Sequence, residues 1–296
     1  MGFQEFTPRG TVFHYCSPSA FTGITDNKEL WFSSLETSND PRELKLGYVY
    51  LLRALKEVAE STETAQDREF FHAFYQQTLP WYSGTDVFCC CFTASRDALP
   101  MWGAYGSDYK GLSIGFRPTG LFDIPARIQK VKYIGPDTSS EFADVIREVM
   151  ARMRVQSADW INQISAVVEP ACKVFATKHN TWSYEEEIRL THVQRRERPE
   201  RCISDLIDVR RIGAFPDGTD VLWSEPLVRI AGSSAVRYKI FKFGRYAGGA
   251  SDHRSAIKEV IIGPLCELSI SDVERSLCAG GYRDVLVTKS RCMIRP

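Results

Sequence analysis

The sequence has no excess charge of either sign: its 296 residues include 37 lysines and arginines against 37 aspartates and glutamates. Proteins that coat nucleic acid usually carry a basic excess, because neutralising phosphates supplies most of their non-specific affinity. The balance therefore disfavours a protein that binds duplexes in bulk or lies on an anionic membrane surface, although it leaves room for a local basic patch. With 44% hydrophobic and 25% charged residues, the composition is that of an ordinary globular protein with a sizeable core.

Long apolar runs are also missing. No stretch approaches the length of about 18 apolar residues that crosses a bilayer, and the first ten residues hold no apolar segment typical of a secretory signal. The nine cysteines lack the paired spacing of a zinc site or a disulfide framework. Cys89, Cys90 and Cys91 would alternate between the faces of a strand and cannot converge on one metal. We expect a cytoplasmic protein with reduced thiols, no metal and no membrane partner.

The signatures of several enzyme classes are absent as well. The chain has no Gly-x-Gly-x-x-Gly after a predicted strand and no phosphate-binding loop that ends in Gly-Lys-Ser/Thr. It also has no Gly-x-Ser-x-Gly elbow and no His-Glu-x-x-His motif. These absences disfavour the common nucleotide-binding loops, the serine hydrolases and the zinc proteases that carry them.

What the chain does have is an apolar pattern typical of an α+β domain. Strands are predicted at 11–16, 30–35, 87–93, 112–116, 187–193, 202–209, 238–243, 260–263 and 285–288. Helices are predicted from Asp40, as N-cap before Pro41 in the first turn, to about Val58, then around 70–74, from about 141 to 168, and from a capping box at Ser271 and Glu274. Strands outnumber helices and do not alternate with them, which disfavours a doubly wound parallel sheet. We therefore predict one domain over residues 1–296, a bent or split, mostly antiparallel or mixed sheet with a helical insertion at about 139–170.

The densest polar cluster lies in residues 178–190. Read as a strand, it places Glu185, Glu187 and Arg189 on one face, which makes a pair of carboxylates beside a cation. Two such carboxylates repel, which raises the pKa of one of them unless a cation or a ligand intervenes. The arrangement suits chemistry in which positive charge develops on a sugar carbon. The alternative is that residues 183–186, which have capping-box spacing, open a solvated helix with acids in its first turn.

Two earlier segments offer further polar groups. His14, with Tyr15 beside it, lies on the strand predicted at 11–16, and Ser33 and Ser34 follow large aromatic residues on the next predicted strand. Both segments are candidates for ligand binding. The alternatives are a histidine that only forms a structural hydrogen bond and an ordinary half-buried strand.

An aromatic segment at 101–106 is predicted to form a turn that precedes the strand at 112–116. The rings of Trp102 and Tyr105 could stack on a planar group such as a base or nicotinamide. The alternative is packing in the core, which is the usual role of such side chains. The mixed-charge run at 195–198 is interpreted as a solvated loop.

Seven short motifs follow one another along the chain. They are Phe-His-Tyr-x-Ser, Leu-Trp-Phe-Ser-Ser, Asn-Asp-Pro, Cys-Phe-Thr, Met-Trp-x-x-Tyr, Lys-Gly-Leu-Ser-Ile-Gly-Phe and Lys-His-x-x-Trp-x-Tyr-Glu-x-Glu-x-Arg-Leu. In this order they resemble the bacterial family catalogued as domain of unknown function 2971. The resemblance extends from about residue 11 to residue 190, with a looser match at 260–263. The family name implies no activity.

The motif order is also similar, more distantly, to that of ADP-ribosyltransferases. Those enzymes place a His or Arg on the first strand, a Tyr or Ser-rich motif on a second and a Glu, often Glu-x-Glu, on a late strand. The resemblance implies that His14 binds a ribose of NAD and that Ser33 or Ser34 supports the nicotinamide half. It implies that Glu187 holds the ribose 2′-hydroxyl and that Glu185 orients the acceptor. The second motif departs from Ser-Thr-Ser and has no Tyr, and the choice between the two glutamates stays open.

This resemblance implies a cytoplasmic bacterial enzyme that uses NAD as substrate and transfers ADP-ribose to a protein or nucleic acid. A toxin or phage-defence effector is then the expected role, with an inhibitor or antitoxin protein as an expected partner. Two alternatives stay open. With water as acceptor the enzyme would be an NAD glycohydrolase. A nucleotide-sensing or interaction module would bind without turnover, with Arg189 paired to Glu187 and with Trp102 and Trp182 in the core.

Overall fold

The structure is a computed structural model. It describes residues 6–294 apart from residues 41, 62–63, 66, 70, 73–74, 77–83, 125, 136–139, 156–169, 171, 197–224, 232 and 248–249. The predicted strand at 202–209 lies outside the described residues, as do most of the helix predicted around 70–74, the second half of the helix predicted at 141–168 and the end of the loop at 195–198.

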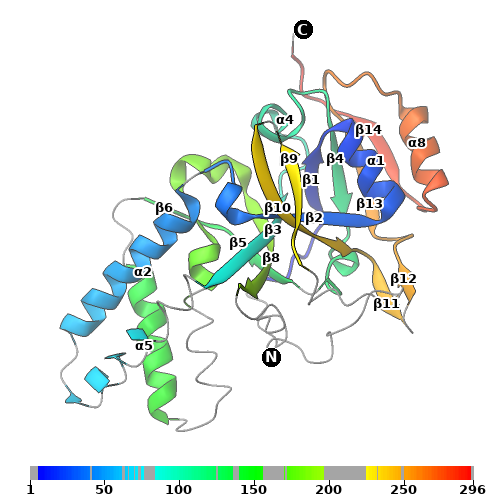
Figure 1. The fold of residues 1–296 in the computed structure, drawn as a ribbon. Coiled ribbons are helices and arrows are strands. Elements are labelled where there is room, and N and C mark those ends of the chain that lie inside the picture. The colour runs from blue at the N-terminus through cyan, green and yellow to red at the C-terminus, as the bar shows by residue number, and fades with distance from the viewer. Residues whose placement is uncertain are drawn as a thin grey trace.

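A ten-stranded mixed sheet organises the molecule (Figure 1). Its main order is β14 (Leu286–Lys289), β13 (Ile257–Ile262), β4 (Leu112–Phe116), β1 (Val12–Cys16), β3 (Thr85–Thr93), β2 (Glu29–Ser34), β10 (Ser234–Lys242) and β9 (Leu227–Ala231). In addition β8 (Glu187–Arg195) pairs with β3, and β5 (Arg127–Lys130) pairs with β8. The pair β13–β14 is parallel and its neighbours are antiparallel. The prediction of an α+β fold with a mixed sheet is confirmed.

Two small sheets and several helices surround this sheet. The small sheets pair β6 (Lys132–Ile134) with β7 (Thr177–His179) and β11 (Arg245–Ala247) with β12 (Ala250–Asp252). The helices are α1 (Pro18–Asn27), α2 (Glu43–Glu60), α4 (Leu99–Tyr105), α5 (Ser140–Val155) and α8 (Ile270–Ala279), with 3₁₀ turns η1 (Leu35–Thr37), η2 (Pro118–Gly120) and η3 (Asn180–Glu185). Within the described part of the chain, no helix has the length and apolarity that crossing a membrane requires.

The sheet divides at β3. Strand β8 pairs with β3 along its whole length, so it occupies one edge of that strand. On the other edge β2 pairs only at Phe88 and Cys89, and β1 pairs only at Thr93. β1 and β2 therefore diverge from each other along the same edge of β3. The Nδ1 atom of His14 lies 2.8 Å from the carbonyl oxygen of Cys91, in the stretch between these two pairings.

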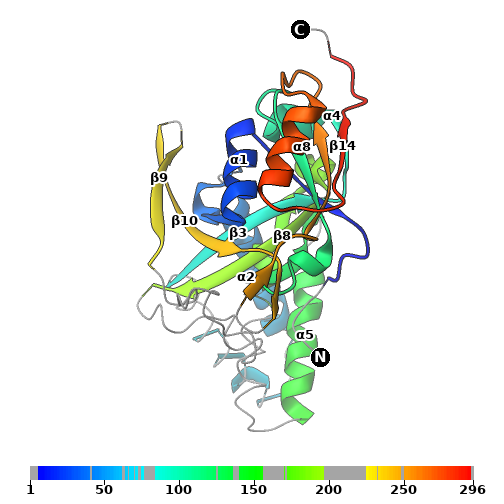
Figure 2. The same ribbon diagram turned by 90° about the vertical axis from the view of Figure 1, so that its right-hand side faces the viewer.

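Apolar side chains form one core on each face of β3 and β8, because successive residues of a strand point to opposite faces. On one face Phe88, Phe92 and Leu190 pack with residues of α1 and α8. On the other face Val87, Cys89 and Val193 pack with residues of α2 and α5, two helices that lie side by side in Figures 1 and 2. The second core covers only part of its face, and the remainder forms the pocket described below.

Several local predictions need correction. Residues 101–106 are not a turn, because most of them belong to helix α4, which has a proline in its first turn. The capping box of α8 is formed by Ser269 and Asp272 rather than by Ser271 and Glu274. Helix α2 begins at Glu43, two residues after the predicted position, while Asp40 accepts a hydrogen bond from the amide of Arg42. Helix α1, with Ser17 as N-cap before Pro18, was not predicted.

Trp102 lies in the core, which was the alternative to its role in stacking a ligand. Its side chain is completely buried, and its ring packs edge-on against Tyr15. Its Nε1 donates to the Oδ1 atom of Asp97 over 2.7 Å, and the same carboxylate accepts bonds from Ser290 and Arg291. Trp102 thereby ties helix α4 to the segment that follows β14.

Replacing Trp102 by phenylalanine should lower the free energy of unfolding by about 1–3 kcal/mol, because the change removes buried volume and one bond to a charged acceptor. Urea titration of the two proteins measures the difference. Trp31→Phe is the control, since Trp31 is 43% exposed and its change should stay within about 0.5 kcal/mol. Equal losses in the two variants would contradict a core role for Trp102.

Candidate functional site

One pocket of about 750 Å³ brings together side chains from distant parts of the chain. The predicted residues among its lining are His14 and Tyr15 of β1, Ser33 and Ser34 of β2, Tyr105 of α4, Glu185 at the end of η3 and Glu187 at the start of β8. Trp102 is not part of the lining. A pocket of this size is in the range that holds small organic ligands.

The two glutamates reach the pocket from a junction between a 3₁₀ turn and a strand. Residues Asn180–Glu185 form η3, Glu186 has a left-handed backbone with φ of 43°, and β8 begins at Glu187. The strand predicted at 187–193 is confirmed as part of β8, whereas the interpretation of 178–190 as one continuous strand is wrong, because η3 lies between β7 and β8. The alternative of a helix opening at 183–186 is also wrong. The turn at Glu186 points its own side chain to the surface, while Glu185 and Glu187 are only 2% and 3% exposed.

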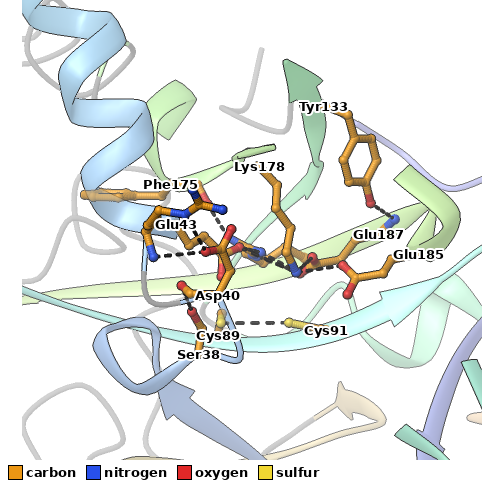
Figure 3. Close-up of polar contacts among 12 residues, drawn as sticks. Ser38, Asp40, Glu43, Cys89, Cys91, Tyr133, Phe175, Lys178, Glu185 and Glu187 are labelled. Carbon is orange, nitrogen blue, oxygen red and sulfur yellow. Dashed lines mark hydrogen bonds and ion pairs between the residues drawn. The ribbon is translucent and has the colours of Figure 1, made fainter. Parts of the chain in front are cut away.

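Lys178 on β7 stands between the two carboxylates (Figure 3). Its Nζ lies 2.6 Å from Oε2 of Glu185 and 3.3 Å from Oε2 of Glu187. Arg189 contacts Glu187 from the other side, with Nε donating to Oε1 over 2.8 Å. Both acids are therefore compensated by buried cations, and Glu187 is shared between two of them.

Residues of helices α2 and α4 complete this cluster. Glu43, in the first turn of α2, forms an ion pair with Arg189 and lies 3.9 Å from Lys178. Arg189 also donates to the carbonyl oxygen of Phe175 over 2.6 Å, and the hydroxyl of Tyr105 donates to Oε1 of Glu185. The cluster thus holds three carboxylates and two cations, a formal charge of −1, on side chains that are all nearly inaccessible to solvent.

The surroundings move the pKa values of the two glutamates in opposite directions. Burial raises the pKa of Glu185, and the contacts with Lys178 and Tyr105 offset only part of that effect. Burial would also raise the pKa of Glu187, but the charges of Arg189 and Lys178 outweigh it and lower its pKa to about 2. Glu187 is therefore a permanent anion near neutral pH, and Glu185 is the acid that takes a proton more readily.

The lowered pKa of Glu187 predicts a pH-dependent stability. Its carboxylate is more acidic in the folded chain than its ordinary value of 4.5, so its stabilising effect is present above pH 4.5 and fades as the pH falls toward 2. The free energy of unfolding of the wild type should exceed that of Glu187→Gln by about 3 kcal/mol at pH 7, and the difference should shrink at pH 3. Urea titrations of both proteins at several pH values measure it. A difference that is constant from pH 7 to 3 would contradict the assignment.

His14 on β1 and the two serines on β2 lie on the two strands that flank the split in the sheet. The imidazole of His14 is half-buried, and burial lowers its pKa despite the opposing contact with the Cys91 carbonyl, so it is a neutral hydrogen-bonding group. The hydroxyl of Ser34 accepts a bond from the amide of Glu36 at the start of η1. The hydroxyl of Ser33 accepts a bond from Arg229 over 3.0 Å.

Metal binding does not account for this concentration of acids. Among the residues that the structure describes, no group of three or more His, Cys, Asp or Glu side chains is arranged to hold a metal ion. The three carboxylates face Lys178 and Arg189 instead.

Several pocket residues were not predicted. Lys178 lies in the dense polar segment at 178–190, but its role depends on its contacts with Glu185 and Glu187, which only the fold creates. Glu43 is part of an amphipathic helix, and nothing in the sequence connects it with Arg189, which lies 146 residues away. Trp31 and Arg229 also line the pocket, and their relation depends on the pairing of β2, β10 and β9.

The comparisons with known proteins bear on part of the chain. Residues 101–190 match the model of the family described as "Protein of unknown function (DUF2971)". The match supports the resemblance to that family. It includes Tyr105, Lys178, Glu185, Glu187 and Arg189, but it ends before β9 and begins after β1 and β2. No curated protein and no solved structure matches the chain.

Proposed function

We propose that the protein cleaves NAD and transfers its ADP-ribosyl group to a macromolecule. The observation that carries the proposal is that His14, Ser33 and Glu187 line one pocket although they come from three separate segments of the chain. These are the positions that the resemblance to ADP-ribosyltransferases implies. A fold in which they faced different surfaces would have removed the basis for the proposal.

The chemistry of such a transfer suits an acidic site. The bond between the ribose C1′ and the nicotinamide nitrogen breaks, and nicotinamide leaves with the bonding electrons as a neutral molecule. Positive charge then develops on C1′ and the ring oxygen. A nucleophile of the acceptor donates an electron pair to C1′ and loses its proton. Fixed negative charge close to C1′ stabilises the state in which this bond breaks.

The different electrostatics of the two glutamates support different roles. Glu187 stays ionised because Arg189 and Lys178 lower its pKa to about 2. Its negative charge therefore stabilises the positive charge that develops on C1′, and it accepts a bond from the ribose 2′-hydroxyl. Burial raises the pKa of Glu185, which suits a carboxylate that orients the acceptor and receives its proton. His14, as a neutral imidazole, binds a ribose hydroxyl, and Ser33 or Ser34 supports the nicotinamide half.

A second candidate is a module that binds a nucleotide without turnover, and the ion-pair cluster favours it. Glu185 and Glu187 are nearly inaccessible and are each compensated by a cation within 3.3 Å. Buried ion pairs of this kind also occur as structural elements of a fold. On this proposal the pocket would recognise a nucleotide, and the acids would only hold β7, β8 and α2 together.

Incubation of the purified protein with NAD tests the proposal. Free nicotinamide is measured by chromatography, and transfer is measured in a bacterial lysate with NAD labelled in its adenylate half. Nicotinamide together with a labelled protein or nucleic acid supports a transferase that acts on a bacterial macromolecule. Nicotinamide and free ADP-ribose without a labelled macromolecule would replace it with a glycohydrolase, and NAD binding without nicotinamide release would select the binding module.

A further inference from the structure

One face of the sheet forms the floor of the pocket from β8 to β9. Cross-strand partners lie on the same face of a sheet, and alternate residues of a strand do as well. The pairs Glu187 with Thr93, Arg189 with Cys91, Cys89 with Ser33, Ser33 with Tyr238 and Val236 with Arg229 therefore place all of these side chains on one face. Four steps between strands, each about 4.8 Å, separate Glu187 from Arg229 along the sheet, or about 19 Å.

The β9 end of this face carries a pair of stacked aromatic rings with a cation beside them. The rings of Trp31 and Tyr238 stack with centroids 4.6 Å apart and an interplanar angle of 27°. The guanidinium of Arg229 lies 5.4 Å from the first ring centroid and 5.8 Å from the second. Trp31 lines the pocket and is nevertheless 43% exposed. A large flat ring left open beside a guanidinium is a surface on which a base can stack.

Arg229 differs from the other arginines of this region in what it contacts. Arg189 is paired with Glu187 and Glu43, and Arg196 and Arg237 are paired with Asp86. Within the described parts of the chain, Arg229 instead donates to the Ser33 hydroxyl, and its buried Nε has no hydrogen-bond partner. Its charge faces aromatic rings and the pocket rather than a carboxylate, so it is open to an anionic ligand.

The charged groups of the pocket therefore differ between its two ends. Its β8 end holds three carboxylates and two cations, and its β9 end holds Arg229 beside the stacked rings. NAD has the complementary distribution, since its nicotinamide ring is cationic and its diphosphate is anionic. A guanidinium can donate two bonds to a phosphate, and an exposed tryptophan can stack on a base.

We propose that Arg229 and Trp31 form a subsite for the diphosphate and the adenine of a dinucleotide, at the end of the pocket opposite Glu187. The inference rests on the proposed function for the identity of the dinucleotide, but the subsite itself requires only an adenosine diphosphate group. It extends the site beyond the segment that matches the family model, to the hairpin β9–β10, which extends to one side of the molecule in Figure 2.

Calorimetric titration with ADP tests the subsite, because ADP lacks the nicotinamide riboside and does not depend on cleavage. ADP should bind the wild type, and Arg229→Gln and Trp31→Ala should each weaken that binding about tenfold or more. Trp31→Phe should retain most of the affinity, since a ring remains. Glu187→Gln, at the other end of the pocket, should bind ADP as the wild type does.

Arg275→Gln is the matched control for charge, since it removes one arginine from the surface of α8, where that side chain is 78% exposed. Thermal unfolding checks that every variant is folded. ADP affinity that is the same in Arg229→Gln, Trp31→Ala and the control, or no ADP binding to the wild type, would overturn the subsite. If NAD is cleaved while these affinities are equal, the subsite fails and the proposed function stands. If ADP binding depends on Arg229 and Trp31 while NAD is never cleaved, the subsite stands and the proposed function fails.

Discussion

Replacing Glu187 by glutamine is expected to lower the release of nicotinamide from NAD by about 10²-fold to 10³-fold, the loss that follows when one fixed group facing a developing charge is removed. The substitution keeps the shape of the side chain and its ability to accept a bond from Arg189. It removes the negative charge that stabilises the positive charge developing on C1′. The rate is measured by chromatography at saturating NAD, at pH 7, where the ion pairs of the cluster are intact.

Glu185→Gln separates the roles of the two acids. If Glu185 orients the acceptor, its substitution lowers the labelling of the macromolecule more than it lowers the release of nicotinamide, because water can still attack C1′. Glu186→Gln is the matched control, since Glu186 lies between the two, is exposed and bonds to the hydroxyl of Ser95. Nicotinamide release that is equal in the wild type, Glu185→Gln and Glu187→Gln would rule out both acids as groups of the reaction.

The sequence was sufficient for much of the secondary structure because short apolar runs carry their own signal. The strands at Val12–Cys16, Leu112–Phe116 and Glu187–Arg195 were predicted close to their observed bounds. The strand β7, with only three residues, and the hairpin strand β9, whose apolar residues are exposed, carry no such alternation. They were missed, although they supply Lys178 and Arg229.

The candidate site could be predicted only in part, because several of its residues come from elements that carry no clear pattern in the sequence. Glu185 and Glu187 are two residues apart, so the sequence brings them together, and spacing alone suggested that they shift each other's pKa. The direction of each shift depends on Lys178, Arg189 and Glu43, whose approach is fixed by the packing of α2 and β7 against β8. The turn at Glu186 could not be read from the strand pattern, because a left-handed residue interrupts the alternation.

That His14 lines the same pocket as these acids is likewise a property of the sheet rather than of the sequence. β1 and β2 are separated by helix α1, and both pair with the same edge of β3. The sequence pattern predicts a bent or split sheet but does not specify which strands diverge. The resulting gap is where the Cys91 carbonyl meets His14.

Substituting methionine for Arg189 is expected to lower the free energy of unfolding by about 3–5 kcal/mol, the cost of removing one partner from a buried ion pair. The Arg189 side chain is 1% exposed and contacts Glu43, Glu187 and the Phe175 carbonyl. Without it, three carboxylates face one cation, and the formal charge of the buried cluster changes from −1 to −2. Urea titration at pH 7 measures the loss.

Arg196→Met provides the comparison that assigns this loss to burial. Arg196 follows β8 and also pairs with two acids, Glu36 and Asp86, but its side chain is 42% exposed. Pairs with an exposed partner contribute about 0–1 kcal/mol, and the buried Asp86 keeps its two bonds from Arg237. This variant should therefore lose less stability than Arg189→Met. Equal losses in the two variants would contradict the buried cluster of ion pairs on which the separate pKa values of the glutamates depend.

The double variant Glu187→Gln, Arg189→Met decides whether the two side chains act as one unit. If the cost of Arg189→Met comes mainly from leaving the Glu187 carboxylate uncompensated, neutralising that carboxylate as well should recover part of the stability. The double variant should then lose less than the sum of the two single losses, with a coupling of about 0.5–3 kcal/mol. Strict additivity would mean that Glu187 is not compensated by Arg189, and its lowered pKa would then need another cause.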